Sequence, residues 1–251
     1  MHWEAMFAAG TGRLLPQSVP RALRAAAEGE GFSAAAARFR AGPCRVVLLK
    51  DVRAGAPEAF LTPDELDAWT SLKIPKRKNE WLGGRLAAKL AGADAFFPEV
   101  PLREIEVHRE LTGSPFLVCR GEKRHVSISH SAGVCGAAAG TDFLGLDIEE
   151  VASRHPGWYR DYFSPAERGG KDDAAMTGLW AGKEALFKAL GLGLSCDTLD
   201  SDLSGPEPVL KGKALARWEE LGRPPFALES FDPGPGLQGR IVFAKRPEIN
   251  R

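Results

Sequence analysis

Apolar residues along the chain follow two periods, one typical of helices and one typical of strands. Helical spacing predicts helices over residues 79–93 and 177–190, the second with the strongest pattern in the chain. The alanine-rich segment 16–40 also predicts one or two helices, with a break at Gly29–Gly31. Alternating or β-branched runs predict strands at 45–52, 103–109, 116–119, 126–130, 134–139, 143–149, 226–231 and 238–244.

Two further segments share one sequence pattern that is typical of a helix start. Thr62-Pro63-Asp64-Glu65 and Ser164-Pro165-Ala166-Glu167 each offer a hydroxyl N-cap, a proline in the first turn and a glutamate three residues after the cap. This combination is the capping box, in which the two side chains satisfy free backbone amides at the helix start. We therefore expect a helix to begin at each segment.

The order of these elements indicates the fold class. Helices and strands mix in both halves of the chain, and the link Ser131-Ala132-Gly133 is too short for a crossover helix. This favours an α+β fold with mixed α/β halves over a doubly wound sheet. A boundary near Gly140-Thr141-Asp142 predicts an N-terminal subdomain, 1–141, and a C-terminal subdomain, 142–251.

Composition and charge exclude several classes of protein. Lys plus Arg number 33 and Asp plus Glu number 33, so no net field attracts nucleic acid. The N-terminus lacks the pattern of a signal peptide, and no apolar run approaches the length of a membrane span. The four cysteines form no C-x-x-C pair, and we expect them to be reduced, buried thiols. These features predict a cytoplasmic protein.

Candidate chemistry gathers on the predicted strand 143–149. Alternation places Gly145, Asp147 and Glu149 on one face, with the two carboxylates about 7 Å apart at the backbone. Like charges this close favour a cation, and Mg²⁺ prefers a few carboxylates with waters and phosphates. We expect Gly145 to leave room for a ligand. The alternative is a half-buried strand with a wet acidic face.

The predicted helix 177–190 carries a charged pair beside large apolar residues. Glu184 and Lys188 are four residues apart and therefore neighbours on one face. Trp180 and Phe187 indicate that the helix packs on more than one side, which makes the pair a candidate site. The alternative is an exposed pair that stabilises the helix by about 0.3–0.5 kcal/mol. Gly191 stands where the helix should stop.

Hydrogen-bonding and basic groups precede these segments. The turn Val126–Ser131 carries hydroxyls and an imidazole that can donate to a phosphate, although a structural histidine is also compatible with it. Adjacent strand residues point oppositely, which disfavours a Ser129–His130 nucleophile pair. Basic residues lie at 73–78, 85 and 89 without the aromatic residues that single-stranded nucleic acid requires, and a solvated face is the alternative.

Together these segments resemble the surfactin-type 4′-phosphopantetheinyl transferases. The motifs are S-I-S-H-S at 127–131, G-L-D-I-E at 145–149 and W-x-x-K-E-A-x-x-K at 180–188, followed by G-L-G-L at 191–194. Gly113-x-Pro115 and Glu167 are also similar, so the resemblance covers residues 60–195. It implies two similar α/β subdomains related by a pseudo-twofold axis, with coenzyme A in the cleft between them, in a monomer.

The resemblance also implies a reaction and its residues. The reaction is Mg²⁺-dependent transfer of 4′-phosphopantetheine from coenzyme A to a serine of an acyl or peptidyl carrier protein, with release of 3′,5′-ADP. Asp147, Glu149 and Glu184 would hold Mg²⁺, and Glu184 would take the serine proton. Lys188 and Lys183 would neutralise the pyrophosphate, and Glu167 would lie near the metal or base. The remaining contacts to coenzyme A would come from Lys76, Arg85, Arg109, Ser129 and His130.

One position departs from the family, and other readings remain. Ser114 stands where members often carry a basic residue that contacts phosphate. Arg109 or Lys123 would then supply this contact.

The alternatives to an active transferase are a holo-acyl-carrier-protein synthase of the short trimeric type, about half this length, and a silent relative that binds coenzyme A or a carrier protein. A structural α+β domain with chance motifs is the third.

Overall fold

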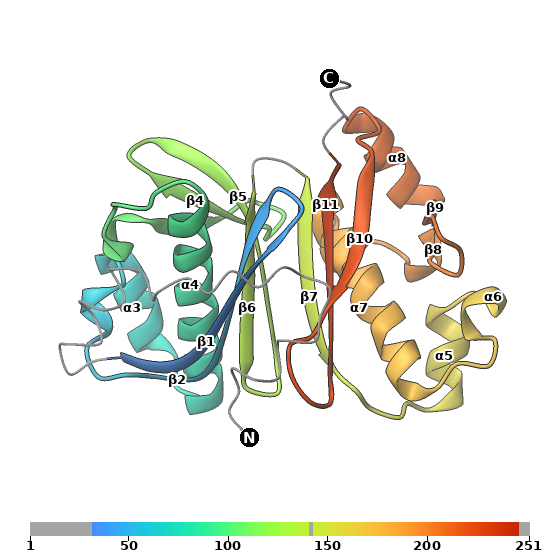
Figure 1. The fold of residues 1–251 in the computed structure, drawn as a ribbon, viewed down its shortest axis with the longest axis horizontal. Coiled ribbons are helices and arrows are strands. Elements are labelled where there is room, and N and C mark those ends of the chain that lie inside the picture. Colours follow the sequence, from blue (N-terminus) through green and yellow to red (C-terminus); the bar gives the residue numbers. More distant parts are fainter. Residues whose placement is uncertain (1–31, 141–142, 246–251) are drawn as a thin grey trace.

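The computed structural model describes residues 32–140 and 143–245, whose strands form two main antiparallel sheets (Figure 1). The first has six strands in the order β1-β2-β6-β5-β4-β3, and the second has three in the order β10-β11-β7. The first sheet comprises β1 (Phe32–Ala41), β2 (Cys44–Ala54), β3 (Glu106–Arg109), β4 (Pro115–Cys119), β5 (Glu122–Ser131) and β6 (Val134–Gly140). The second comprises β7 (Leu144–Glu150), β10 (Phe226–Phe231) and β11 (Leu237–Ala244).

One long helix covers the outer face of each sheet. Helix α4 (Pro75–Ala95) packs against β2, β5 and β6, and α7 (Asp173–Leu190) packs against β7 and β11. Shorter elements surround them: α3 (Pro63–Ser71), α5 (Pro156–Tyr162), α6 (Pro165–Arg168), β8 (Ser201–Asp202), β9 (Val209–Leu210) and α8 (Gly212–Glu220). Figure 1 shows α4 and α7 on opposite sides of the molecule, with the sheets between them.

The inner faces of the two sheets share one apolar core. Val46 and Leu48 of β2 belong to the same buried cluster as Leu146 and Ile148 of β7 and Phe243 of β11. Two further clusters lie beneath α4 and α7 on the outer faces of the sheets. The layers are therefore helix, sheet, sheet and helix, which confirms the predicted mixed α/β fold.

Both predicted capping boxes are present. The Thr62 hydroxyl accepts from the Glu65 amide at 3.3 Å, and the Glu65 carboxylate accepts from the Thr62 amide at 3.0 Å. The corresponding distances at Ser164 and Glu167 are 3.2 and 2.9 Å. Both glutamates are buried, so each has a role in the core besides capping its helix.

The helical prediction for residues 16–40 is wrong over its described part. Residues 32–41 form β1, which pairs with β2 in a register that sets Phe39 opposite Val46, while residues 16–31 lie outside the described ranges. Pairing with β2 and packing of Ala37 and Phe39 on the shared core outweigh the helix propensity of alanine. Strand β3 is also shorter than predicted, because residues 102–104 form a 3-10 turn.

The remaining predicted strands and both long helices are confirmed, with α4 beginning before the predicted start. All four cysteines are free and buried, as expected. The helices α5 and α8 and the short strands β8 and β9 were not predicted. Among the described residues, no helix has the length and apolar character that a membrane span requires.

Candidate active site

Helix α7 lies directly on the face of β7 that carries Asp147 and Glu149. A Cβ atom on Gly145 would stand 1.9 Å from the carbonyl oxygen of Ala185, in the backbone of α7. The expectation that Gly145 leaves room for a ligand is therefore wrong. The missing side chain lets the helix approach the strand, and this contact brings the charged residues of α7 over β7.

Asp147 is the buried centre of the site, with 3% of its surface exposed. Its Oδ1 accepts from Lys188 Nζ at 2.6 Å and from Ser129 Oγ at 2.8 Å. Its Oδ2 is buried and has no hydrogen-bond partner within the described part of the chain. A buried carboxylate oxygen without a partner is costly, and a cation would satisfy it.

Lys188 connects the two sheets at this point. Besides Asp147, its Nζ donates to the carbonyl oxygens of Leu146 on β7 at 3.2 Å and of Ile128 on β5 at 3.5 Å. The ammonium group therefore lies at the junction of β5 and β7, where the N-terminal and C-terminal sheets meet.

Glu149 and Glu184 both respond to the charge of Asp147. Burial, and then the negative charge of Asp147, raise the pKa of Glu149 to about 7, although the Trp180 indole donates to it at 3.3 Å. Burial and Asp147 likewise raise the pKa of Glu184, against the opposing charge of Lys188. The negative charge of Asp147 thus acts on both glutamates, and the positive charge of Lys188 only partly offsets it.

These residues fit a divalent cation chemically. Within residues 32–140 and 143–245, no three His, Cys, Asp or Glu side chains are already arranged as a set of metal ligands. Asp147 instead has one oxygen held by Lys188 and one unpaired. An unpaired carboxylate oxygen beside two carboxyls with raised pKa values is the donor set and the charge imbalance that a hard cation relieves.

Two serine hydroxyls join β5 to β7 beside this cluster. Ser127 Oγ accepts from the Leu146 amide at 2.9 Å, and Ser129 Oγ accepts from the Ile148 amide at 3.2 Å. Ser129 uses its one hydroxyl proton on Asp147. It cannot donate to a phosphate while this bond persists, so the structure places it as a support for Asp147.

Two of the predicted phosphate-binding residues meet at the start of α4. The Nδ1 atom of His130, whose side chain is 49% exposed, lies 4.0 Å from Glu80, and Lys76 Nζ lies 3.9 Å from the same carboxylate. Sequence reasoning missed Glu80, although its spacing of four residues from Lys76 was a usable signal.

The two arginines occupy different environments. Arg85 is largely buried, donates to the Val107 carbonyl, and lies 3.9 Å from Glu65, so it is tied to the N-terminal core. Arg109 is exposed and donates to the Gly113 carbonyl at 3.1 Å. The exposed Lys123 is paired with Glu110. Of these three cations, Arg109 is the one that a ligand can reach without breaking an ion pair.

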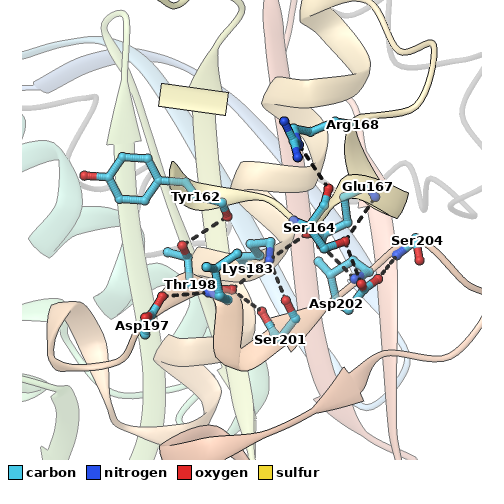
Figure 2. A network of polar contacts seen from close by, with 12 residues as sticks. Tyr162, Ser164, Glu167, Arg168, Lys183, Asp197, Thr198, Ser201, Asp202 and Ser204 are labelled. Carbon is cyan, nitrogen blue, oxygen red and sulfur yellow. Dashed lines mark hydrogen bonds and ion pairs between the residues drawn. The ribbon is translucent and has the colours of Figure 1, made fainter. Parts of the chain in front are cut away.

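Lys183 and Glu167 do not join the carboxylate cluster. Both side chains are fully buried, and they pair with each other at 3.0 Å (Figure 2). The predicted contact of Lys183 with the pyrophosphate does not fit this position, because a buried ammonium with carboxylate and carbonyl partners cannot reach a ligand. The same applies to a metal or base role for Glu167.

A small cavity of about 170 Å³ lies elsewhere at the junction of the sheets. Its lining residues are Lys50, Ala132, Val134, Glu150, Val151, Gly234, Pro235, Gly236 and Leu237. None of the predicted site residues lines it, so it does not mark the carboxylate site.

The segment that carries these carboxylates is similar in sequence to a known protein family. Residues 143–222 match the family described as the 4′-phosphopantetheinyl transferase superfamily. Over 81 residues the chain is 38% identical to the holo-[acyl-carrier-protein] synthase of Bacillus subtilis (strain 168), a match covering 30% of this chain and 66% of that relative.

Two further relatives carry the same name. The Staphylococcus carnosus (strain TM300) protein is 32% identical over 91 residues, covering 35% of this chain and 78% of that relative. A Campylobacter jejuni protein (subsp. jejuni serotype O:23/36, strain 81-176) is 41% identical over 80 residues, covering 29% and 70% respectively. The chain belongs to the 4′-phosphopantetheinyl transferase superfamily. The matched region contains Asp147, Glu149, Glu184 and Lys188, whereas residues 76–130 lie outside it.

Proposed function

We propose that this chain transfers the 4′-phosphopantetheine group of coenzyme A to a serine of an acyl or peptidyl carrier protein and releases 3′,5′-ADP. The observation that carries the proposal is the cluster of Asp147, Glu184 and Lys188, built by β7 and α7 inside the region that matches the superfamily. The relatives' name, holo-[acyl-carrier-protein] synthase, describes the same reaction.

Asp147, Glu149 and Glu184 would hold Mg²⁺. When bound, the ion would neutralise the negative charge that develops on the phosphate oxygens during the reaction. Glu184, which lies near enough to feel the charges of Asp147 and Lys188, would take the proton of the carrier serine. Lys188, whose ammonium group lies at the junction of the two sheets, would neutralise the leaving phosphate.

The nucleotide of coenzyme A would lie against the N-terminal half. Helix α4 begins without a side-chain cap, and Lys76, Arg77 and Lys78 occupy its first turn. Free amides and three cations at a helix start favour an anion there. Lys76 and His130, which both lie near Glu80, would contact phosphate there. Arg109 and Arg85 would supply further contacts to the nucleotide from β3 and from the middle of α4.

The surfactin-type arrangement, with subdomains 1–141 and 142–251 related by a pseudo-twofold axis, also belongs to this proposal. A matched feature supports it: in each half, a capping-box glutamate is buried against a lysine of the long helix. The pairs are Glu65 with Lys89 of α4 and Glu167 with Lys183 of α7. A chain with two such halves needs no second copy to form the cleft, and we propose a cytoplasmic monomer that binds neither nucleic acid nor membrane.

The test is intact-mass spectrometry of apo carrier proteins incubated with the protein, coenzyme A and Mg²⁺, with an EDTA control. We expect the carrier to gain the phosphopantetheine mass only with Mg²⁺, and Glu184→Gln to abolish the gain without loss of fold. Binding of coenzyme A without transfer to acyl, aryl or peptidyl carriers would identify a silent relative. A near-normal rate for Glu184→Gln would remove Glu184 from the role of base.

A further inference from the structure

A fully buried ion pair between Lys183 of α7 and Glu167 of α6 lies beside the carboxylate cluster in sequence but is not part of it (Figure 2). Lys183 Nζ donates to Glu167 Oε2 at 3.0 Å, to the Thr198 carbonyl at 2.7 Å and to the Ser201 carbonyl at 2.5 Å. An ammonium group has three protons, and each has a partner here. The proposed reaction makes no use of this pair.

Glu167 is equally well satisfied. Its Oε1 accepts from the Leu203 amide at 2.8 Å, and its Oε2 accepts from the Ser164 amide at 2.9 Å as well as from Lys183. The pair therefore fixes one point of α7 to two other segments, α6 and residues 198–203. Displacing Lys183 along or around the helix axis would leave buried charges unpaired, which is strongly unfavourable.

The fixed point is next to the site. Glu184 follows Lys183 in α7 and turns by about 100° around the helix toward Asp147. On the strand side, contact between Gly145 and the backbone at Ala185 sets how closely the helix approaches β7. The ion pair and the glycine contact together hold α7 from two sides within three successive residues.

We propose that the Glu167–Lys183 pair positions α7 so that Glu184 and Lys188 meet Asp147, and that neither member of the pair contacts substrate. This inference rests on the proposed function for its kinetic readout. Its structural readout, described below, does not depend on that function.

The chain offers a matched control in its other half. Glu65 Oε2 lies 2.5 Å from Lys89 Nζ, which also donates to the Leu102 carbonyl at 3.2 Å. Glu65 is likewise a capping-box glutamate, and Lys89 is likewise fully buried in a long helix. None of the three proposed metal ligands lies on α4.

The experiment compares two double variants, Glu167→Gln/Lys183→Met and Glu65→Gln/Lys89→Met. Removing both charges leaves neither the glutamate nor the lysine of a pair buried without its partner. In the α4 variant, Arg85, 3.9 Å from Glu65, keeps its hydrogen bond to the Val107 carbonyl, so both proteins are expected to fold. One readout is kcat and KM for coenzyme A. The other is the NMR signal of the Trp180 indole N–H, which donates to Glu149 from α7 and is assigned with Trp180→Phe.

We expect the α7 variant to lose at least tenfold in kcat and to shift the Trp180 signal, with KM for coenzyme A little changed. The α4 variant should keep kcat and the Trp180 signal. Equal kcat and an unchanged Trp180 signal in both variants would overturn the proposal, because the pair would then serve stability alone.

Single variants separate positioning from direct binding of phosphate. Positioning predicts that Glu167→Gln lowers kcat as Lys183→Met does, whereas a phosphate-binding Lys183 predicts a raised KM for coenzyme A in Lys183→Met only. If the α7 double variant does not fold, Glu167→Asp decides by both readouts, because it keeps the charge opposite Lys183 and shortens the side chain that fixes α7. An inactive wild-type protein would refute the proposed function, and the Trp180 signal would still test the positioning.

Discussion

At the scale of single residues, the structure separates side chains that the sequence groups together. Ser129 and His130 are neighbours in one motif, yet Ser129 bonds to Asp147 and His130 faces Glu80. Lys183 and Glu184 are also neighbours, yet they lie on different sides of α7. A motif therefore identifies positions with polar or ionisable side chains. The direction in which each side chain points follows from what the helix or strand packs against.

Ser127 and Ser129 of β5 give a controlled test at this scale. Ser129→Ala should lower the free energy of unfolding by about 1–3 kcal/mol and also lower kcat, because Asp147 loses a hydrogen bond. Ser127→Ala removes a similar bridge to the Leu146 backbone without touching Asp147, and should affect stability only. Urea unfolding and steady-state kinetics measure both effects. A raised KM for coenzyme A with unchanged kcat in Ser129→Ala would instead make Ser129 a phosphate ligand.

At the scale of elements, the packing of α7 on β7 builds the site. The sequence predicts both the helix, from its apolar period, and the strand, from its alternation. It does not predict the close approach of the helix to the strand, because this approach depends on Gly145 lying under the backbone of Ala185. The carboxylates of the strand and the charged pair of the helix become one site only through this contact.

Gly145→Ala should therefore displace α7 and remove activity. The added Cβ would meet a backbone atom, which cannot move alone, and we expect a loss of more than about 3 kcal/mol in the free energy of unfolding. Gly84→Ala in α4 is the control, since its Cβ would meet a side-chain methyl, Cγ2 of Ile128 at 3.0 Å, and no backbone atom of another element. The gain of about 1 kcal/mol in helix propensity should offset that contact. Normal stability and turnover in Gly145→Ala would show that the added Cβ fits between β7 and α7 without displacing the helix.

At the scale of the whole molecule, the two sheets are joined by a common apolar core. Leu48 of β2 is fully buried in the same cluster as Leu146 and Ile148 of β7. Because each sheet completes the core of the other, we expect the two halves to unfold together even though each has its own helix layer.

Leu48→Ala tests this coupling. The substitution should lower the free energy of unfolding by about 2–5 kcal/mol while keeping a single urea transition. Hydrogen exchange should show weaker protection of amides in β7 and β11 as well as in β2. Leu90→Ala, in the separate cluster under α4, is the control for a cavity of similar chemistry. Two transitions, with the second sheet unaffected by Leu48→Ala, would indicate independent halves.

The sequence by itself determined the local elements and identified the candidate site residues. Capping boxes, apolar periods and the alternation of 143–149 depend on near neighbours in the chain, and these predictions hold at Thr62, Ser164 and Asp147. Tertiary structure alone decided that residues 32–41 pair as a strand, that Gly145 admits a helix, and that Lys183 is buried while Lys188 reaches Asp147. The physical reason is that pairing, close approach and burial depend on segments distant in sequence, whose positions no local pattern contains.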